Sequence, residues 1–529
     1  MSEHSWATRS DLNRNEQWKL AKDGLAILQE IPSLGTKAFK EIDPSDVERL
    51  KWAGIYAQRP KDGHFLVRVK LPSGRLNAEQ ARVLAQIAKD YGQNGIQITI
   101  RQAVQIHNIT LKEAPDILAR INQVHLSSVE ACGDVPRTIL GNPLMGLDPE
   151  ELLDTTELVD KSYRYFLGNP EYSNLPRKFK LSISSNPHDT GFARINDLAL
   201  VPAKKEDILG FHAYIGGGLS DQPKLAQKLP FFVRPEDVFR LAKATVTLFR
   251  EEGYRTDRHH CRLKFLVEDW GIEKVAIKLE ELAGAFERGG EEVRKPWNRG
   301  VFYGIHEQKQ KGLYYAGVCI PAGYMTGDDL EIFATLAEKY GDGTLRTTNS
   351  QNILLANIPE ENVEALQKEE IFTRYTLTPQ NFSGYAASCT GLPYCNFAPV
   401  DTKKRLQTLV DALDKAFPNI GVPVRINMTG CAHSCAHPQI ADIGFTGGKA
   451  KVGDTVTDAF TVHIGGALGM DVALGTVLQG KVPAEKLFVF VSALLKHYLA
   501  VREEQEPFYA TARRLGSKPW QEILNQFGA

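Results

Sequence analysis

Net charge, long apolar runs and cysteine are all scarce in this sequence. Lysine plus arginine (63) nearly equals aspartate plus glutamate (64), so the chain lacks the overall basic excess that would indicate nucleic-acid binding. The longest apolar run, residues 487–495, is less than half of the ~20 residues that cross a bilayer. We therefore expect no nucleic-acid partner and no membrane span, and we predict a buried helix at 487–495.

Cysteine accounts for only 7 of the 529 residues, which argues against a disulfide framework in a chain of this size. The N-terminal residues 1–24 are polar and charged and lack the apolar core of a secretion signal. We therefore expect a cytoplasmic protein whose clustered cysteines hold metal or carry out redox chemistry. Disorder is not indicated, because 43% hydrophobic and 24% charged residues are close to average soluble usage. The length predicts roughly three to five domain-sized units.

The sequence contains an internal duplication. Residues 64–109 align without gaps to residues 313–358, and the identical pairs share one offset of 249. These pairs include Pro72/Pro321, Gly74/Gly323, Ala85/Ala334, Tyr91/Tyr340, Gly92/Gly341, Gln102/Gln351 and Asn108/Asn357. Each copy has an alternating apolar stretch, a Pro-x-Gly turn, a helical period and a second alternating stretch, which predicts a β-α-β unit.

Two further pairs of segments extend the duplication. Residues from Lys180 onward match residues from Arg425 onward at an offset of 245, and residues 211–219 match 460–468 at an offset of 249. Segments 211–219 and 460–468 are each expected to form a strand that ends in glycines. Such glycines can let backbone N-H groups approach an anion, or they can simply form a tight strand-to-helix turn. The order is therefore small, large, small, large, and pseudo-twofold symmetry would place a ligand between the halves.

Four cysteines occur only in the second copy of the large unit, with the spacing C-x5-C, 35 residues, C-x3-C: Cys389, Cys395, Cys431 and Cys435. Structural zinc sites usually have tighter C-x2-C to C-x4-C pairs. A four-thiolate iron-sulfur cluster tolerates wider spacing, because separate loops can approach its irons. The pattern favours an iron-sulfur cluster, with zinc or incidental buried cysteines as the alternatives. The three isolated cysteines are expected to be ordinary buried residues: Cys132, Cys261 and Cys319.

The cysteine-containing segments CTGLPYC and TGCAHSCAHPQIADIGF resemble the cluster and heme signature of the siroheme-dependent nitrite and sulfite reductases. Other segments, including GNPLMGLDPEELLDT, NLPRKF and CNFAPVDTK, resemble ferredoxin-dependent nitrite reductases in particular. The resemblance implies an internally duplicated α/β (α+β) fold with pseudo-twofold symmetry. Its expected parts are an N-terminal extension (1–50), ferredoxin-like half-domains (51–127 and 305–378), a siroheme-binding, substrate-side α/β domain (128–304) and a [4Fe-4S]/siroheme α/β domain (379–529).

The same resemblance implies the cofactors and their ligands. Cys389, Cys395 and Cys431 would bind a [4Fe-4S] cluster, and Cys435 would bind it while also bridging to the siroheme iron as its axial ligand. No ligand role follows for His433 and His437, which replace residues that are commonly Asn or Gln in the family.

Four basic residues resemble the family's oxyanion-binding set: Arg101, Arg137, Lys178 and Lys180. Such cations would neutralise the bound oxyanion, polarise its bonds and relay protons with water. Arg101 and Lys180 lie in alternating stretches, where an outward-facing charge on a sheet is the ordinary alternative.

Individual residues and longer motifs favour different substrates, sulfite and nitrite. Lys180 stands where plant-type nitrite reductases usually have Asn and sulfite reductases have Lys, and His107 is also more typical of the sulfite branch. Some sulfite reductases carry a cysteine close to the arginine that corresponds to Arg137, and this cysteine cross-links to a tyrosine. The corresponding residue here is Val135, so we expect no cysteine-tyrosine cross-link. Because the longer motifs favour nitrite, we expect six-electron reduction of nitrite to ammonia, as in nitrate assimilation, with assimilatory sulfite reduction to sulfide as the alternative. Two other functions compete with that of a reductase. The protein could be a structural zinc protein that binds another macromolecule, or a related protein that keeps the cluster but has no reductase activity.

The sequence has no G-x-G-x-x-G that opens a helix after a strand, so electrons must come from another protein. The resemblance implies ferredoxin. Lys403–Arg405 and the Lys449/Lys451 pair are candidates for docking this acidic donor, although lysine runs are also ordinary solvated surface. The remaining partner is a small oxyanion substrate, and we expect a monomer.

Overall fold

The duplicated segments form two small sheets that exchange one strand each. The computed structural model describes residues 5–220 and 222–528. The first sheet has the order β1-β2-β5-β4-β14 and the second the order β12-β13-β16-β15-β3. Their strands are β1 (Ile55–Ala57), β2 (His64–Val69), β3 (Arg75–Asn77), β4 (Gly95–Ile98), β5 (Val104–Thr110), β12 (Gly304–Glu307), β13 (Leu313–Val318), β14 (Tyr324–Thr326), β15 (Thr344–Thr347) and β16 (Ile353–Pro359).

The exchange obeys the offset found in the sequence. Strand β14 of the second copy pairs with β4 of the first, and β3 of the first copy pairs with β15 of the second. Two glutamines at equivalent positions reinforce the exchange. Gln351 Nε2 donates to the carbonyl of Ile98 at 2.9 Å, and Gln102 Nε2 donates to the carbonyl of Thr347 at 3.4 Å. The β-α-β units predicted from the repeat are therefore present, but neither sheet is built from one copy alone.

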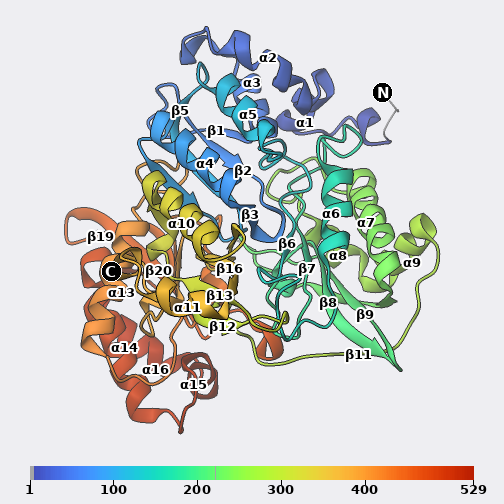
Figure 1. Cartoon of the computed structure of the whole chain (residues 1–529). Helices are drawn as coiled ribbons and strands as arrows, with labels where there is room; N and C mark the ends of the chain where they lie inside the picture. The colour runs from blue at the N-terminus through green and yellow to red at the C-terminus, as the bar shows by residue number, and fades with distance from the viewer. Residues whose placement is uncertain (1–4, 221, 529) are drawn as a thin grey trace.

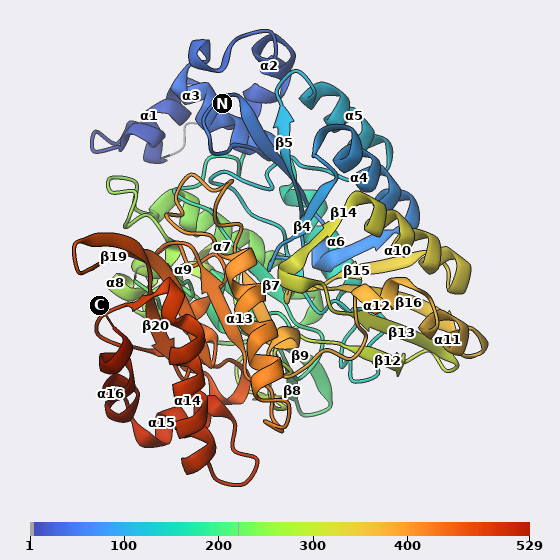
Figure 2. The same cartoon turned by 90° about the vertical axis from the view of Figure 1, so that its left-hand side faces the viewer.

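The helix of each copy begins at an equivalent capping box. Asn77 caps α4 (Ala78–Tyr91) with Gln80, and Thr326 caps α10 (Gly327–Tyr340) with Asp329. Each box satisfies two backbone N-H groups that the first helical turn leaves free. The two helices lie side by side in both views of the molecule (Figures 1 and 2). Their apolar faces belong to one buried cluster that includes residues of both copies, so the two small units share a core.

Each large unit has its own core and a mixed sheet with the same plan. Two short strands run parallel to a long strand, which pairs in antiparallel orientation with a second long strand. The first sheet has the order β10-β9-β8-β7-β6 and the second the order β17-β18-β19-β20-β21. The strands are β6 (Leu140–Gly141), β7 (Leu181–Ile183), β8 (Leu198–Lys205), β9 (Ile208–Ile215), β10 (Gln227–Val233), β11 (Glu291–Glu292), β17 (Ala386–Ser388), β18 (Ile426–Thr429), β19 (Ile443–Val452), β20 (Thr455–Ile464), β21 (Thr476–Val477) and β22 (Val482–Pro483). The duplicated α/β (α+β) fold predicted from the sequence is confirmed.

The remaining helices cover the sheets and the N-terminal side (Figure 1). They are α1 (Arg14–Ala21), α2 (Ile27–Leu34), α3 (Pro44–Arg49), α5 (Ala114–Gln123), α6 (Thr156–Phe166), α7 (Val238–Glu252), α8 (Leu263–Trp270), α9 (Ile272–Ala283), α11 (Glu360–Gln367), α12 (Ile371–Arg374), α13 (Lys403–Ala416), α14 (Leu487–Val501), α15 (Phe508–Leu515) and α16 (Lys518–Phe527). The predicted helix at 487–495 is the first part of α14, where Phe490 and Leu494 are buried while Phe488 and Val489 are exposed. Within the described residues, none of the helices has the length and apolar character needed to span a bilayer.

Candidate functional site

Two of the four cysteines follow the carboxyl ends of neighbouring parallel strands. Cys389 comes directly after β17, and Cys431 comes two residues after β18. Because β17 and β18 run parallel in register, their ends meet at one edge of the sheet. The Cys389 amide donates to the carbonyl of Met428 at 3.2 Å, and the Gly430 amide donates to Cys389 Sγ at 3.1 Å.

The other two cysteines lie in tight turns beside this edge. The Cys395 amide closes a turn on the carbonyl of Gly391 at 2.9 Å. Cys435 lies in the loop after β18, between Ser434 and His437, which both have a left-handed backbone with φ of 54°. Such values are uncommon outside glycine and let the chain fold back sharply within a few residues.

The thiols influence one another electrostatically, which shows that the four lie together. Burial raises the pKa of Cys389 and of Cys395, and it raises the pKa of Cys431 to about 12; in all three, charge on Cys435 acts in the same direction. Backbone N-H groups that donate to these sulfurs oppose the effect. Within residues 5–220 and 222–528, no group of three or more His, Cys, Asp or Glu side chains is arranged to hold a single metal ion.

The four predicted basic residues come from three separate segments. Arg137 precedes β6, and Lys178 and Lys180 precede β7. Arg101 lies in the turn between β4 and β5 and Lys180 just outside β7, so neither is a strand residue as the alternating pattern had indicated. The Arg101 guanidinium donates to Asn196 Oδ1 at 3.0 Å and to the carbonyl of Thr138 at 2.7 Å.

Mutual repulsion shows that these cations converge. The pKa of Arg101 is lowered to about 9, mainly by burial and next by the charge of Arg137. Burial, then Arg101, lowers the pKa of Lys180 to about 7. Burial and neighbouring cations, Lys180 among them, hold the pKa of Lys178 well below its usual range, whereas Cys435 acts in the opposite direction on both lysines. The basic group and the cysteine group therefore meet at Cys435.

Backbone contacts fix Arg137 and Lys178 relative to each other. The amide of Arg137 donates to the carbonyl of Phe179 at 2.8 Å, and the amide of Phe179 donates to the carbonyl of Val135 at 3.0 Å. The Arg137 guanidinium donates to the carbonyl of Gly133 at 3.0 and 2.7 Å and to the carbonyl of Ala131 at 3.2 Å, so two of its five N-H groups have no acceptor among these bonds. These bonds leave part of the guanidinium free to bind an anion.

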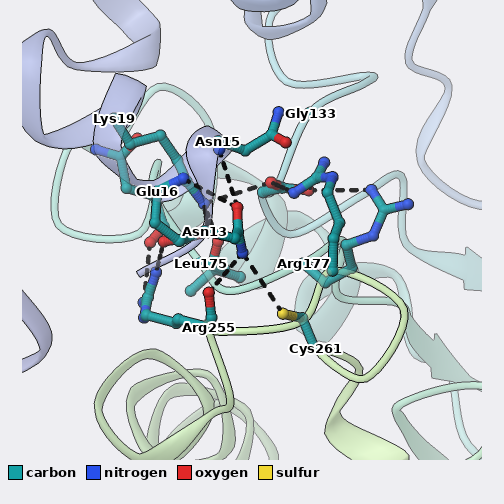
Figure 3. A network of polar contacts seen from close by, with 12 residues as sticks. Asn13, Asn15, Glu16, Lys19, Gly133, Leu175, Arg177, Arg255 and Cys261 are labelled. Atoms are coloured by element: carbon teal, nitrogen blue, oxygen red, sulfur yellow. Dashed lines mark hydrogen bonds and ion pairs between the residues drawn. The ribbon is translucent and has the colours of Figure 1, made fainter. Parts of the chain in front are cut away.

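A buried ionic network behind this pair ties the N-terminal helix to it (Figure 3). Lys19 of α1 donates to the carbonyl of Leu175 at 2.8 Å and lies 3.3 Å from the Asp134 carboxylate. Arg177 and Arg258 also contact Asp134, at 3.4 and 2.9 Å. Although burial favours the neutral form, Arg258, Lys19 and Arg177 hold the pKa of Asp134 well below its usual range. Glu16 of α1 pairs with Arg255, and both side chains are fully buried.

Sequence reasoning missed several residues of this region. Arg68 donates to Gln105 Oε1 at 2.9 and 2.6 Å, and although burial opposes it, charge on Cys132, then Tyr56 and Cys435, raises the pKa of Arg68. Cys132, expected to be an ordinary buried residue, lies beside Tyr56: burial and Cys132 raise the pKa of the Tyr56 phenol to about 12. Cys132 therefore belongs to this region. Its place in ACGDVPR, five residues before Arg137, was the available signal.

The structure shows the surroundings of two histidines noted in the sequence, His437 and His107. His437 is buried, and burial together with Lys180 and Arg101 holds its pKa well below the usual range, so it lies beside the basic group. His107 instead stacks on Tyr394 with ring centroids 4.4 Å apart, within the loop that joins Cys389 to Cys395. The His107 ring therefore supports the cysteine loop.

Most of the proposed docking lysines are already engaged. Arg405 and Lys449 both pair with Asp458, at 3.0 and 2.6 Å, and Lys451 lies 3.7 Å from Asp454. Lys403 is partly buried and donates to the carbonyl of Ala322. The exposed groups next to the cysteines include Arg59 and Phe397, the latter 62% exposed and in edge contact with the exposed His433.

Comparisons with known proteins agree with this geometry. Residues 132–285 and 385–526 match the family described as "Nitrite and sulphite reductase 4Fe-4S domain", and residues 56–124 and 306–370 match the "Nitrite/Sulfite reductase ferredoxin-like half domain". The chain belongs to the nitrite and sulfite reductase family. It is an oxidoreductase, and the family's cofactors are a [4Fe-4S] cluster and siroheme.

Relatives with both substrates are similar over nearly their whole length. A protein of Synechococcus elongatus named ferredoxin-nitrite reductase is 37% identical, over 91% of this chain and 95% of that protein. A protein of Mycolicibacterium paratuberculosis named sulfite reductase [ferredoxin] 1 is 33% identical, over 97% of each. The solved structure of Mycobacterium tuberculosis NirA is 32% identical and superposes with a TM-score of 0.93, covering 98% of this chain and 99% of that one.

The residues present fit both cofactors. Four thiols within mutual electrostatic influence, with backbone N-H groups directed at three of the sulfurs, are the donor set that an iron-sulfur cluster requires. The cationic group next to Cys435 suits a macrocycle with several carboxylates and an anionic substrate.

Proposed function

We propose that this chain reduces nitrite to ammonia with six electrons supplied by ferredoxin. The observation that carries the proposal is that Cys435 acts electrostatically both on the other three cysteines and on Lys178 and Lys180. A thiol that belongs to both groups places electron entry beside anion binding. Nitrite is favoured over sulfite because the first six of the similar curated proteins are named ferredoxin-nitrite reductases, at 33–37% identity.

In this proposal Cys389, Cys395 and Cys431 would hold the [4Fe-4S] cluster, and Cys435 would hold both the cluster and the siroheme. When bound, the siroheme supplies the iron on which nitrogen-oxygen bonds are broken. The chain's own residues bind and orient the oxyanion. Arg101 and Arg137 have backbone and amide partners on one side, so their remaining N-H groups face the anion in a fixed geometry.

Lys178 and Lys180 have a different task, because a lysine can release a proton. The pKa of Lys180 is lowered by burial and Arg101 to about 7, so its ammonium can donate a proton near neutral pH and be recharged afterwards. Arginine keeps its charge and therefore serves as an electrostatic clamp. The two arginines thus hold the substrate while the two lysines neutralise it and supply protons.

Sulfite reduction to sulfide is the second candidate, and Lys180 is the observation that favours it. Sulfite carries more negative charge than nitrite, and Lys180 adds a cation where the sequence comparison with plant-type nitrite reductases indicated Asn. Because the case for sulfite depends on this one lysine, a direct comparison of turnover with the two substrates decides between them.

The decisive experiment is steady-state turnover of the siroheme-loaded protein with nitrite and sulfite in parallel, with a reduced dye as donor. We expect a higher kcat/KM with nitrite. A higher kcat/KM with sulfite would make the chain a sulfite reductase with the same cofactors. A repeat with reduced ferredoxin in place of the dye tests the donor, and size-exclusion chromatography tests the expected monomer. We propose a cytoplasmic location and a role in nitrate assimilation.

A further inference from the structure

Asn196 is a buried amide that connects the loop before β8 to Arg101. Its side chain is almost completely enclosed, and the residue as a whole is 1% exposed. Nδ2 of Asn196 donates to the carbonyl of Phe192 at 2.8 Å and to the carbonyl of Gly191 at 3.3 Å. Oδ1 accepts a hydrogen bond from the Arg101 guanidinium at 3.0 Å. Because the two carbonyls take both amide protons, they fix which end of the side chain faces Arg101.

The Arg101 guanidinium is held at two of its three nitrogens. Nη1 donates to Asn196, and Nη2 donates to the carbonyl of Thr138 at 2.7 Å. The Nε-H group is buried and has no hydrogen-bond partner among the described residues. A buried donor without an acceptor costs stability, and an anionic ligand can remove that cost. The guanidinium is therefore fixed in place and still has donors left for an anion.

The second copy of the large unit shows that this loop does not need an asparagine to adopt its backbone conformation. Ala441 occupies the equivalent position, at the offset of 245. The amides of Asn196 and Ala441 each close a turn on the carbonyl three residues earlier, both at 3.3 Å. The carbonyls of both residues accept a hydrogen bond from a glycine amide at 2.9 Å. Since the backbone bonds are the same with alanine, the Asn196 side chain calls for an explanation outside the loop.

The asparagine occurs in the copy that also carries the guanidinium. The residue equivalent to Arg101 in the second copy is Ser350, which has no guanidinium to hold. The next residue, by contrast, is aspartate in both copies, as Asp197 and Asp442, and it accepts a backbone amide in each. The aspartate therefore has a role that both copies share, whereas the asparagine accompanies Arg101.

We propose that Asn196 is a positioning residue for the oxyanion, which holds the Arg101 guanidinium in the orientation that binds the anion; this inference rests on the proposed function. Asn196 acts through Arg101 and does not itself contact the anion. Without Oδ1 the guanidinium keeps one anchor, the Thr138 carbonyl, while the charges of Arg137 and Arg262 repel it. Anion binding would then have to order the guanidinium as well, which lowers affinity.

A double-mutant cycle tests whether Asn196 acts through Arg101. The wild type, Asn196→Ala, Arg101→Ala and the double variant are each loaded with siroheme. Nitrite and sulfite dissociation constants are measured by the change in siroheme absorbance, and kcat and KM are measured with a reduced dye. Ser182→Ala is the matched control, because the Ser182 hydroxyl donates to the carbonyl of Gly191 at 2.7 Å, on the same loop, without contacting Arg101.

We expect Asn196→Ala to raise the anion dissociation constant and KM about threefold to tenfold, since a hydrogen bond to a charged group is lost, while kcat changes by less than about twofold. Arg101→Ala should raise the dissociation constant further. Addition of Asn196→Ala to Arg101→Ala should change it by less than about twofold, because the group through which Asn196 acts is already gone. Ser182→Ala should leave it unchanged.

Two outcomes of the cycle would overturn the inference. One is an unchanged dissociation constant in Asn196→Ala. The other is an equal increase from Asn196→Ala with and without Arg101, which would show that the asparagine acts on the loop alone.

Asn196→Asp gives a second test if Asn196→Ala fails to fold. Its carboxylate keeps an acceptor for Arg101 but compensates the charge of the guanidinium, so anion affinity should fall at least as far as in Asn196→Ala. Wild-type affinity in Asn196→Asp would contradict the positioning role. The substrate is tested separately, by the wild-type kcat/KM for nitrite and for sulfite. A preference for sulfite would reject nitrite reduction, and the cycle would still be decided by the sulfite dissociation constants.

Discussion

Lys180 and Arg425 occupy equivalent positions in the two halves, yet only one of them is left free. The amide of Lys180 donates to Asp197 Oδ2 at 2.9 Å, and the amide of Arg425 donates to Asp442 Oδ2 at 2.7 Å. The Arg425 guanidinium is enclosed, 5.4 Å from the centre of the Trp297 ring and bonded to the carbonyl of Arg299. Lys180 instead faces the other cations and Cys435. The duplication therefore turned one position into a structural cation and the other into a substrate-facing one.

The two positions should respond differently to substitution. Lys180→Asn should lower kcat/KM for the oxyanion about tenfold to a hundredfold, because a hydrogen bond to a charged group contributes about 1.5–3 kcal/mol. It should leave the melting temperature unchanged, since no structural partner is lost. Arg425→Met should instead destabilise the fold by about 1–3 kcal/mol, since the carbonyl of Arg299 loses its donor. Kinetics and thermal unfolding of both variants check this, and similar effects in the two would contradict it.

Oxyanion affinity should weaken as pH rises through about 7. The pKa of Lys180 is lowered by burial and Arg101 to about 7, so below this pH the lysine is charged and above it the free site loses one cation. The nitrite dissociation constant should therefore increase about tenfold per pH unit on the alkaline side until the bound-state pKa is reached. Lys180→Arg should shift this limb to higher pH. Spectral titration with nitrite across the pH range measures it, and a dissociation constant independent of pH would contradict it.

The sequence predicted the duplication and the cysteine group because each leaves a local trace, whereas the four cations came from the resemblance to the nitrite and sulfite reductases. Gapless alignment at one offset identified the repeats, and the spacing around Cys389 and Cys431 identified a thiol group. These signals depend on residue type and spacing, which are directly readable. The strand exchange left no such trace, because a β-strand carries no mark of which copy it will pair with.

The sequence also gave no sign that some of the proposed docking residues are paired with a carboxylate. The pairing of Arg405 and Lys449 with Asp458 joins residues on a helix and two strands, so a basic run appeared free when only its own segment was considered. Arg101 appeared to continue a strand because its neighbours are apolar, yet the chain turns at Thr99, whose amide bonds to the carbonyl of Ala103 at 2.8 Å. Tertiary contacts decide such cases, and composition does not show them.

The four cysteines should act as one unit in cofactor binding. Replacement of any one by alanine should remove most acid-labile sulfide and iron, since a cubane needs its full thiolate set. Cys435→Ala should in addition abolish the coupling between cluster and heme. Cys261→Ala, which removes a buried thiol bonded to the carbonyl of Asp257 at 2.8 Å, serves as the control and should retain both. Iron and sulfide analysis of protein prepared without oxygen tests this. Full cluster content in Cys395→Ala would remove that residue from the ligand set.

Asp134 should matter for both stability and substrate binding. Asp134→Asn leaves Lys19, Arg177 and Arg258 without their shared carboxylate, and breaking a buried ion pair in this way costs about 3–5 kcal/mol. Because Arg137 lies three residues later and is bonded to Gly133, we also expect weaker nitrite affinity. Arg9→Ala, which removes an exposed pair with Asp11, is the control and should change neither. Denaturant unfolding and nitrite titration distinguish the two effects.

Electron delivery by ferredoxin should depend on Arg59, although electron delivery by a small dye should not. Arg59 is exposed and donates to the carbonyls of Asn396 and Ala398, at 3.2 and 3.4 Å, on the loop that follows Cys395. Arg59 is thus a cation beside the cysteine loop that an acidic donor can contact, whereas Arg405 and Lys449 are already paired with Asp458. Arg59→Glu should therefore raise the KM for ferredoxin several-fold, with a smaller penalty at high salt, because screening weakens the repulsion. Dye-driven kcat should stay the same, since the cluster ligands are unchanged. Lys486→Glu, on the surface before α14, is the matched control. Equal losses with ferredoxin and with dye would show that Arg59 supports the cysteine loop and does not contact the donor.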